Sequence, residues 1–183
     1  MIWKSSIWPT GYSIRPIKMQ NHLTAGGGMY CCGIGGPLLG RGFDVAIIDD
    51  PVKNAEEARS EAVRQRNVDW YQTTLRTRAE PGASIILIMQ RWDELDLAGH
   101  LLSSSERGGE QWEVISLPAV AEEDDWLGRE PGEALWPEKY TVEMLERIRG
   151  VIGPDIYEAL YQTRPKPPGG QMYKQEWIRL ITT

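Results

Sequence analysis

The apolar and polar positions of the chain divide it into short strands and amphipathic helices. Residues 43–48 form an apolar, β-branched run that ends abruptly in Asp49, Asp50 and Pro51, a pattern typical of a strand buried on both faces of a parallel sheet. From Asn54 onward the pattern changes to helical spacing. It predicts one long helix, broken near Asn67, whose inward stripe consists of Ala58, Ala62, Val63, Trp70, Tyr71, Thr74 and Leu75.

Later apolar runs predict further strands that alternate with helices. Pro81 and Gly82 should end the long helix, and residues 84–89 should form the next buried strand. Because helices separate the strands and polar residues follow each strand, we predict an α/β fold whose site lies at the carboxyl edge of the sheet. The other predicted elements are strands over 29–34 and 112–117 and helices over 96–104, 142–149 and 154–162.

Chain length and charge narrow the class of protein. A chain of 183 residues suits one compact domain, and a Pro/Gly-rich stretch from Arg164 to Gly170 predicts a domain over 1–163 with a linker and tail over 164–183. The net charge of −6 argues against a protein that coats nucleic acid regardless of sequence. No apolar run approaches the about 18 residues of a membrane span, and no secretory leader is visible, so we expect no membrane partner and a cytoplasmic setting.

The glycine-rich stretch before the first apolar strand is similar to a nucleotide-binding loop but lacks its chemistry. A phosphate-binding loop has the pattern GxxxxGK[ST], in which the lysine contacts phosphates and the hydroxyl contacts Mg²⁺. In Gly35-x-x-x-x-Gly40-Arg41-Gly42, arginine and glycine stand at those two positions. A true loop of this kind also opens a helix, whereas a strand follows here. We therefore interpret the stretch as a glycine turn between two strands.

The two acids after the first apolar strand carry a stronger functional prediction. Adjacent carboxylates at the tip of a buried strand repel each other, which indicates a cation or a proton-transfer role. In nucleotide hydrolases this is the Walker B arrangement, in which one carboxylate holds Mg²⁺ and the next polarises the attacking water. By itself, the same Asp49-Asp50-Pro51 sequence also suits a plain helix-entry turn with solvated acids.

Four blocks, in order over residues 24–177, resemble the ATPase region of the phage large terminase subunit, the motor that packages DNA into procapsids. The blocks are TAGGGMYCCGIGGPLLGRGFDVAIIDDPVKNAEEA, WYQTTLRTRAEPGASIILIMQRWDELDLAGHLL, GEALWPEKY and YEALYQTRPKPPGGQMYKQEW. The resemblance implies a P-loop NTPase-like, RecA-like three-layer sheet. It covers the half of that domain with the Walker B and coupling motifs.

The resemblance also implies roles for individual residues. Asp49 would be the Mg²⁺-associated acid and Asp50 the catalytic carboxylate, where many family members have Glu. Gln90 would match the coupling motif that senses the γ-phosphate of ATP, and Arg91 beside it would help to bind the nucleotide. For Gln90, the alternative is a cap at the strand end. Arg41 would reach a neighbouring subunit's ATP; the alternative is an ion pair with Asp44 or Asp49.

Parts of the family pattern are not found in this sequence. The adenine-contacting segment and a GxxxxGK[ST] loop would precede Thr24, and a nuclease domain would follow the linker. We therefore expect no ATPase activity from this chain alone, and an unpaired apolar edge beside residues 84–89, where the phosphate-loop strand would lie. The partners implied are double-stranded DNA, the portal protein and the small terminase subunit, all in the cytoplasm of the bacterial host. A separate chain carrying Walker A is a further candidate partner.

Two other functions compete with the motor interpretation. A Mg²⁺-dependent nuclease would use Asp49, Asp50 and one of Asp93 or Asp96 as metal ligands. A non-catalytic assembly module, or a prophage remnant, would dock on an intact terminase or a portal ring without needing those carboxylates.

Overall fold

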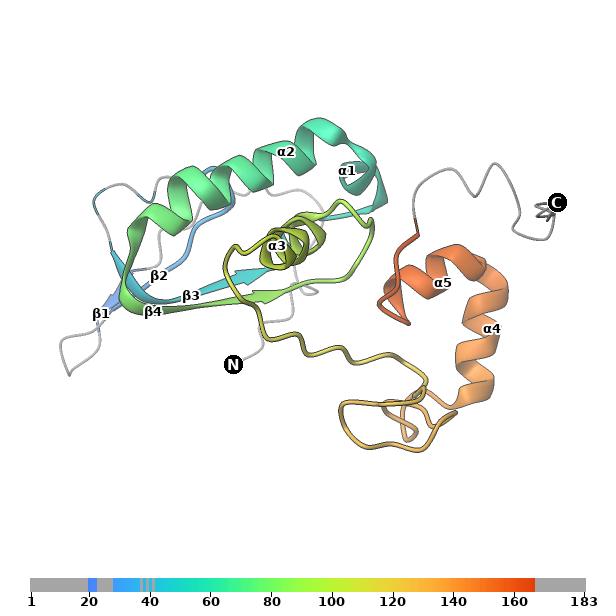
Figure 1. Cartoon of the computed structure of the whole chain (residues 1–183). Coiled ribbons are helices and arrows are strands. Elements are labelled where there is room, and N and C mark those ends of the chain that lie inside the picture. The colour runs from blue at the N-terminus through green and yellow to red at the C-terminus, as the bar shows by residue number, and fades with distance from the viewer. Residues whose placement is uncertain (1–19, 23–27, 37, 39, 41, 167–183) are drawn as a thin grey trace, which may run out of the picture. The chain divides into compact units, whose positions relative to one another are not determined.

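The computed structural model describes residues 20–22, 28–36, 38, 40 and 42–166 (Figure 1). The chain divides into two compact units, Met1–Gly42 and Phe43–Thr183, and each is described by itself. In this described part, none of the helices has the length and apolar character needed to span a bilayer. Most of the predicted linker lies beyond residue 166 and so falls outside these residues.

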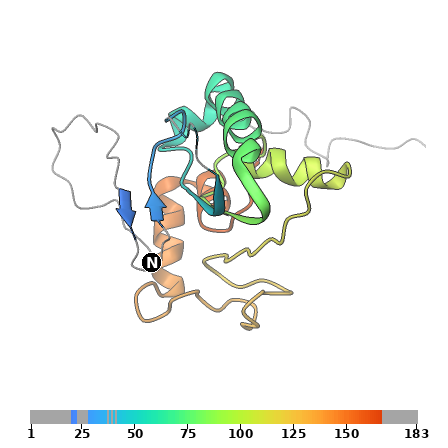
Figure 2. The ribbon, with the colours of Figure 1, turned by 90° about the vertical axis from the view of Figure 1, so that its left-hand side faces the viewer.

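The first unit contains a short antiparallel pair of strands. Strand β1 (Gln20–His22) pairs with β2 (Gly28–Tyr30), with Asn21 opposite Met29 (Figure 2). The strand predicted over 29–34 is wrong beyond Tyr30, because the chain turns there and the amide of Gly36 donates to the carbonyl of Gly33 at 2.8 Å. Gly35 has φ 79°, a left-handed conformation that glycine adopts without steric penalty.

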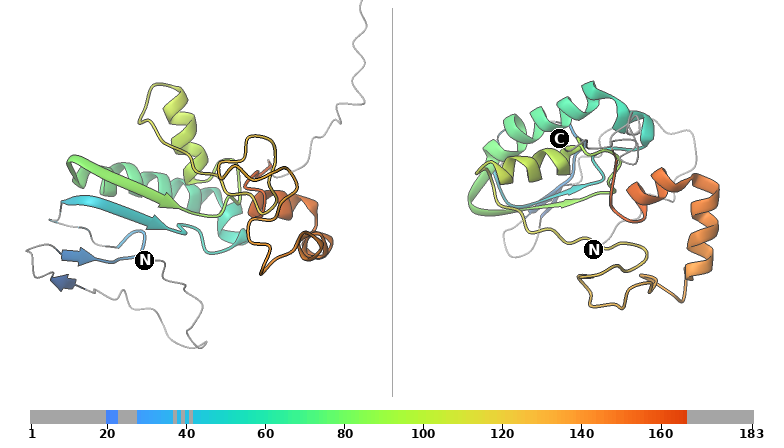
Figure 3. Two further views of the ribbon diagram at one scale, coloured as in Figure 1. Left: turned by 90° about the horizontal axis from the view of Figure 1, so that it is seen from below. Right: turned by 45° about the vertical axis from the view of Figure 1, so that its right-hand side comes forward.

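The second unit is built around a parallel pair of strands, which confirms the α/β class. Strand β3 (Phe43–Asp49) runs beside β4 (Ala79–Ile88), with Ala46 opposite Ile85 and Asp49 opposite Ile88 (Figure 3). The prediction that Pro81 and Gly82 end the helix is wrong, because both lie inside β4. The strand pairing shifts register between Phe43 and Val45, so Pro81 and Gly82 lie in a bulge of β4. In a bulge, the missing N–H of proline breaks no hydrogen bond between the strands.

Alternate residues of the two strands face opposite ways. Ala46, Ile48, Ile85 and Leu87 are buried or half-buried on the face along which helix α2 lies (Figure 1). On the other face, the exposed fractions are 58% for Val45, 63% for Ile47, 46% for Ile86 and 52% for Ile88. The prediction of burial on both faces is therefore wrong within the described residues, and a third layer stays a prediction.

The predicted long helix is a series of shorter ones. It consists of α1 (Ala55–Arg59), α2 (Glu61–Trp70), the π-helix η1 (Tyr71–Leu75) and the 3₁₀-helix η2 (Arg76–Arg78). The break lies at Ser60 and not near Asn67, because Ser60 has extended backbone and caps the amide of Val63 with its hydroxyl. The predicted start is confirmed: Asn54 Oδ1 accepts the amide of Glu57 at 2.9 Å.

Helix α3 (Leu97–Glu106) confirms the helix predicted over 96–104 and packs against α2. Asp96 caps it, accepting the amide of Gly99 at 2.9 Å. The strand predicted over 112–117 is wrong, because these residues pair with no strand in the described part of the chain. Val114 and Ile115 are each more than half exposed, so their apolar character reflects no burial there.

The last two described helices pack against the loop around Ala134 and form a small hydrophobic core. The helices predicted over 142–149 and 154–162 are confirmed as α4 (Val142–Ile152) and α5 (Pro154–Leu160). Leu145 and Tyr157 pack with Ala134 of the loop. The Gln162 side chain holds this loop by donating to the Val120 carbonyl and accepting the Val120 amide, both at 3.0 Å.

Alanine substitutions at two helical glycines should change the free energy of unfolding in opposite directions. A Cβ at Gly99 in α3 would lie 1.8 Å from the carbonyl oxygen of Glu94, whereas one at Gly150 in α4 would meet nothing within 4 Å. We expect Gly99→Ala to lower the free energy of unfolding by about 1–3 kcal/mol through overpacking. Gly150→Ala should raise it by about 0.5–1 kcal/mol, because alanine is the better helix former. Urea unfolding measures both, and equal signs for the two variants would contradict this account of Gly99.

Candidate functional site

The two predicted acids lie at the carboxyl edge of the sheet. Asp49 is the last residue of β3, and Asp50 follows it. The ladder extends one step beyond the strand, because the amide of Asp50 donates to the carbonyl of Ile88 at 2.9 Å. Both aspartates are exposed, so their carboxylates lie at the open end of the sheet and not in its core. This placement agrees with the predicted edge.

Asp50 turns toward the neighbouring strand. Its φ is 42°, a left-handed conformation in which aspartate is more common than most residues but which is still strained. In this conformation, the Asp50 carboxylate accepts a hydrogen bond from the backbone amide of Gln90 at 3.3 Å. The structure therefore brings together two of the predicted site residues, which are 40 positions apart in the chain.

The buried side-chain amide of Asn67 contacts the turn at Asp50 and Pro51. The sequence did not identify Asn67 as part of the site. Asn67 of α2 is 1% exposed, and its Nδ2 donates to the carbonyl of Pro51 at 3.1 Å. Its Oδ1 is buried and has no hydrogen-bond partner in the described part of the chain. A buried unpaired polar atom costs about 1–3 kcal/mol, so Asn67 is not the side chain that stability alone would favour. One sequence feature could have identified it: Asn67 lies four residues from both Val63 and Tyr71 on the inward stripe.

The other acids near the carboxyl end of β4 are paired with arginines. Arg91 Nε lies 2.9 Å from Asp96 Oδ2 and 3.1 Å from Oδ1, and the Asp96 side chain is fully buried. Asp93 is 3% exposed and lies 3.5 Å from Arg64 Nη1. The described residues contain no group of three or more His, Cys, Asp or Glu that could hold a metal ion. The acids of the nuclease alternative therefore form no such group within the described residues.

Arg41, predicted to reach a neighbouring subunit's ATP, lies outside the described residues. The turn that carries it is described in part: Gly40 has φ 69°, and β3 begins three residues later at Phe43. This agrees with a glycine turn that leads into a strand instead of a helix. The role of Arg41 stays a prediction.

The aspartate pair fits the ligand chemistry of Mg²⁺. Mg²⁺ takes oxygen ligands, commonly one or two carboxylates, and completes its shell with water and substrate phosphates. Asp49 and Asp50 offer two adjacent, exposed carboxylates, and exposure leaves room for those further ligands. The two carboxylates therefore fit the oxygen-ligand chemistry of Mg²⁺.

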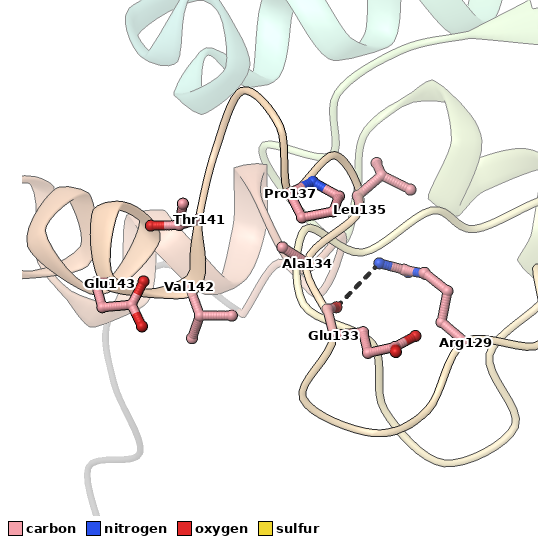
Figure 4. A pocket seen from close by; sticks show the side chains of 8 residues that line it. All are labelled: Arg129, Glu133, Ala134, Leu135, Pro137, Thr141, Val142 and Glu143. Carbon is pink, nitrogen blue, oxygen red and sulfur yellow. Dashed lines mark hydrogen bonds between the residues drawn. The ribbon is translucent and has the colours of Figure 1, made fainter.

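A separate hollow of about 510 Å³ lies within the loop around residue 133 and the start of α4 (Figure 4). Arg129 borders it and organises the loop: its guanidinium donates to the carbonyl of Glu133 at 3.2 Å and to that of Pro118 at 2.9 Å. The hollow contains none of the predicted site residues. Its lining consists of Arg129, Glu133, Ala134, Leu135, Pro137, Thr141, Val142 and Glu143.

The ion pair in this loop predicts an acid-dependent stability. Hydrogen bonds from the Arg129 side chain, followed by backbone amides of Arg129 and Leu127, hold the pKa of Asp125 below its ordinary value of 3.8. Because the pKa is lower in the folded state, the stabilisation is complete above pH 3.8 and is lost as the pH falls through the folded-state pKa.

Urea unfolding of Asp125→Asn tests this dependence. We expect the variant to be less stable than the parent protein at neutral pH, and the difference should shrink below pH 3.8. Asp124→Asn, which makes the same charge change at the adjacent exposed residue, serves as the control and should show little difference at either pH. A difference for Asp125→Asn that does not change with pH would exclude the ion pair as its source.

The fold and the site define an α/β protein with paired carboxylates at the open edge of its sheet. Residues 33–180 match the family described as terminase large subunit, T4likevirus-type, N-terminal. The chain therefore belongs to the terminase large subunit family, whose members are components of the phage DNA-packaging motor. Comparisons with curated proteins and with solved structures gave no match.

Proposed function

We propose that the carboxyl edge of the β3–β4 sheet is the ATP-hydrolysing site of a DNA-packaging motor. In this proposal, Asp49 is the acid associated with Mg²⁺ and Asp50 is the catalytic carboxylate. Gln90 is the residue through which hydrolysis is coupled to movement of DNA. The observation that carries the proposal is the hydrogen bond from the Gln90 amide to the Asp50 carboxylate, at 3.3 Å, across the ends of two parallel strands.

This hydrogen bond supports the proposal in two ways. It holds the Asp50 carboxylate at the end of β4, beside the Gln90 amide. It also makes the conformation of residue 90 depend on that of Asp50, which is what a coupling residue requires. The φ of 42° at Asp50 adds weight, because strained conformations occur preferentially at functional sites.

The chemistry follows from the residue types. Bound Mg²⁺ would neutralise charge on the phosphates and orient them. Asp49, the last residue of β3, would hold that ion through a carboxylate oxygen. Asp50 would accept a proton from the attacking water or orient that water, as a general base does. Aspartate is one methylene shorter than glutamate, so the water would have to lie closer to the β3 end than it would with glutamate.

The partners of the proposed motor follow from the family. They are double-stranded DNA, the portal protein and the small terminase subunit, in the cytoplasm of the bacterial host. The proposed site also needs a GxxxxGK[ST] loop, a pattern that these 183 residues do not contain, and a separate chain carrying that loop is a further candidate partner. The isolated 183-residue chain is accordingly proposed to be inactive.

Phosphate release from ATP in the presence of DNA and Mg²⁺ tests the proposal. The chain alone should give no release above background, and the chain mixed with a terminase polypeptide carrying the phosphate-binding loop should give release. A loop polypeptide whose lysine is replaced by alanine serves as the control and should restore nothing. Mg²⁺-dependent nicking of plasmid by the chain alone, abolished by Asp49→Ala, would favour the nuclease alternative instead.

A further inference from the structure

The Asp50 turn rests on few backbone contacts. Asp50 itself is anchored on one side by its amide, which donates to the carbonyl of Ile88. The next residue, Pro51, has no N–H, so its carbonyl is its one backbone group that can form a hydrogen bond. Asn67 binds that carbonyl through Nδ2 at 3.1 Å, from a helix 16 positions further along the chain.

The hydrogen bond to Pro51 fixes the orientation of the Asn67 side-chain amide. Because the Pro51 carbonyl can only accept a hydrogen bond, the nitrogen of the Asn67 amide must face it, and the oxygen must face the other way. That oxygen is buried without a partner in the described part of the chain, and the whole residue is 1% exposed. A leucine of similar size would remove the unpaired oxygen, but it would also remove the donor to Pro51.

We infer that Asn67 is a positioning residue for the candidate site. By holding the carbonyl of Pro51, it fixes the residue that follows Asp50, and so keeps Asp50 in the left-handed conformation in which its carboxylate meets the Gln90 amide. Its unpaired oxygen is a stability penalty retained together with that contact. This inference deepens the proposed function and rests on it for the meaning of the Asp50–Gln90 contact, but the contact itself can be tested without nucleotide.

Amide hydrogen exchange of the 183-residue chain, followed by NMR, tests the inference. In Asn67→Leu we expect the amides of Gln90 and Asp50 to exchange about fivefold faster, the factor that corresponds to one ordinary hydrogen bond. The ladder amides within β3 and β4 should keep their rates, because leucine still fills the space under the sheet. Gln65→Leu serves as the control: it replaces an exposed amide of the same helix, bonded only to Asp69 among the contacts described, and should change neither set.

A double variant shows whether Asn67 acts through Asp50. Asp50→Ala should accelerate exchange of the Gln90 amide by itself, and adding Asn67→Leu should accelerate it no further. Additive effects, uniform acceleration of all β3 and β4 amides, or an unchanged Gln90 amide in Asn67→Leu would each overturn the inference. If Asn67→Leu does not fold, Asn67→Ala, which is smaller and cannot overpack the site, provides the same comparison.

Turnover separates this inference from the proposed function. In the mixture with the phosphate-loop polypeptide, Asn67→Leu should lower kcat for ATP and leave KM unchanged, since the residue positions a reacting group and contacts no substrate. If the parent mixture hydrolyses no ATP, the proposed function fails, and the exchange measurement still decides whether Asn67 positions Asp50.

Discussion

Replacing Asp50 with asparagine should lower ATP hydrolysis by about 10²–10⁴-fold in a mixture that supplies the phosphate-binding loop. Asparagine has nearly the same shape as aspartate, and its side-chain oxygen can still accept the Gln90 amide, so the turn should persist. What it lacks is the negative charge that takes a proton from water. We therefore expect kcat to fall while KM for ATP stays within about threefold, as for an interaction made chiefly in the transition state.

Asp44→Asn is the matched control for this experiment. It makes the same charge change on an exposed residue of the same strand, near the opposite end of β3 from the site. It should leave kcat and KM within about twofold of the parent values, as expected for a surface substitution away from the chemistry. If Asp50→Asn and Asp44→Asn behave alike, Asp50 is not the catalytic carboxylate.

Asp49→Asn should differ from Asp50→Asn in its dependence on the metal. If Asp49 holds Mg²⁺, the asparagine variant should need a higher Mg²⁺ concentration for half-maximal hydrolysis, and excess Mg²⁺ should restore part of the rate. Asp50→Asn should not be restored in this way, because its missing function is proton transfer. Titration of Mg²⁺ at saturating ATP distinguishes the two variants.

Replacing Asp96 with alanine should lower the free energy of unfolding by about 3–5 kcal/mol, which is the penalty for breaking a buried ion pair from one side. The Asp96 carboxylate is fully buried and binds Arg91 Nε through both oxygens. It also caps α3 by accepting the amide of Gly99, so the substitution removes two structural contacts at once. Urea or thermal unfolding measures the loss.

Asp96→Asn separates the two contributions. Asparagine caps a helix as well as aspartate does, but it cannot form the ion pair, so we expect a smaller loss of about 1–3 kcal/mol. Glu94→Ala, at an exposed residue two positions earlier, should change stability by less than about 0.5 kcal/mol. A loss for Asp96→Ala no larger than that for Glu94→Ala would mean that the ion pair contributes nothing to stability.

The placement of Asp50 and Gln90 at one edge of the sheet could be predicted from the sequence, because each residue follows an apolar strand run. Two apolar runs joined by a helical segment form parallel neighbouring strands, and the residues after such strands meet at one edge. The same reasoning did not identify the partner of Arg91, which was predicted to help bind the nucleotide. The structure pairs it with Asp96, five residues later, where α3 begins. The Asp96 carboxylate that accepts the Gly99 amide at the start of α3 is the same one that pairs with Arg91.

Some elements could not be predicted because periodicity does not reveal what a segment meets. Residues 112–117 have the composition of a strand, but composition cannot supply a neighbouring strand, and the described residues contain none beside them. The apolar spacing around Ser60 is that of one continuous helix. The helix nevertheless breaks there, because the Ser60 hydroxyl accepts the amide of Val63 and begins a new helix. Pro81 and Gly82 act as helix terminators in isolation, yet the bulge accommodates them within β4.

For this protein, the sequence by itself determined the α/β alternation, the Asn54 cap of α1, the start of α5 at Pro154, and the position of two carboxylates at the end of β3. Each depends on residues within a few positions of one another, where backbone geometry and side-chain period decide the result. The left-handed Asp50, the Asn67 amide beneath Pro51 and the pairing of Arg91 with Asp96 were decided only by the tertiary structure. They depend on which groups meet once the chain is folded, and burial then determines which polar atoms must find partners.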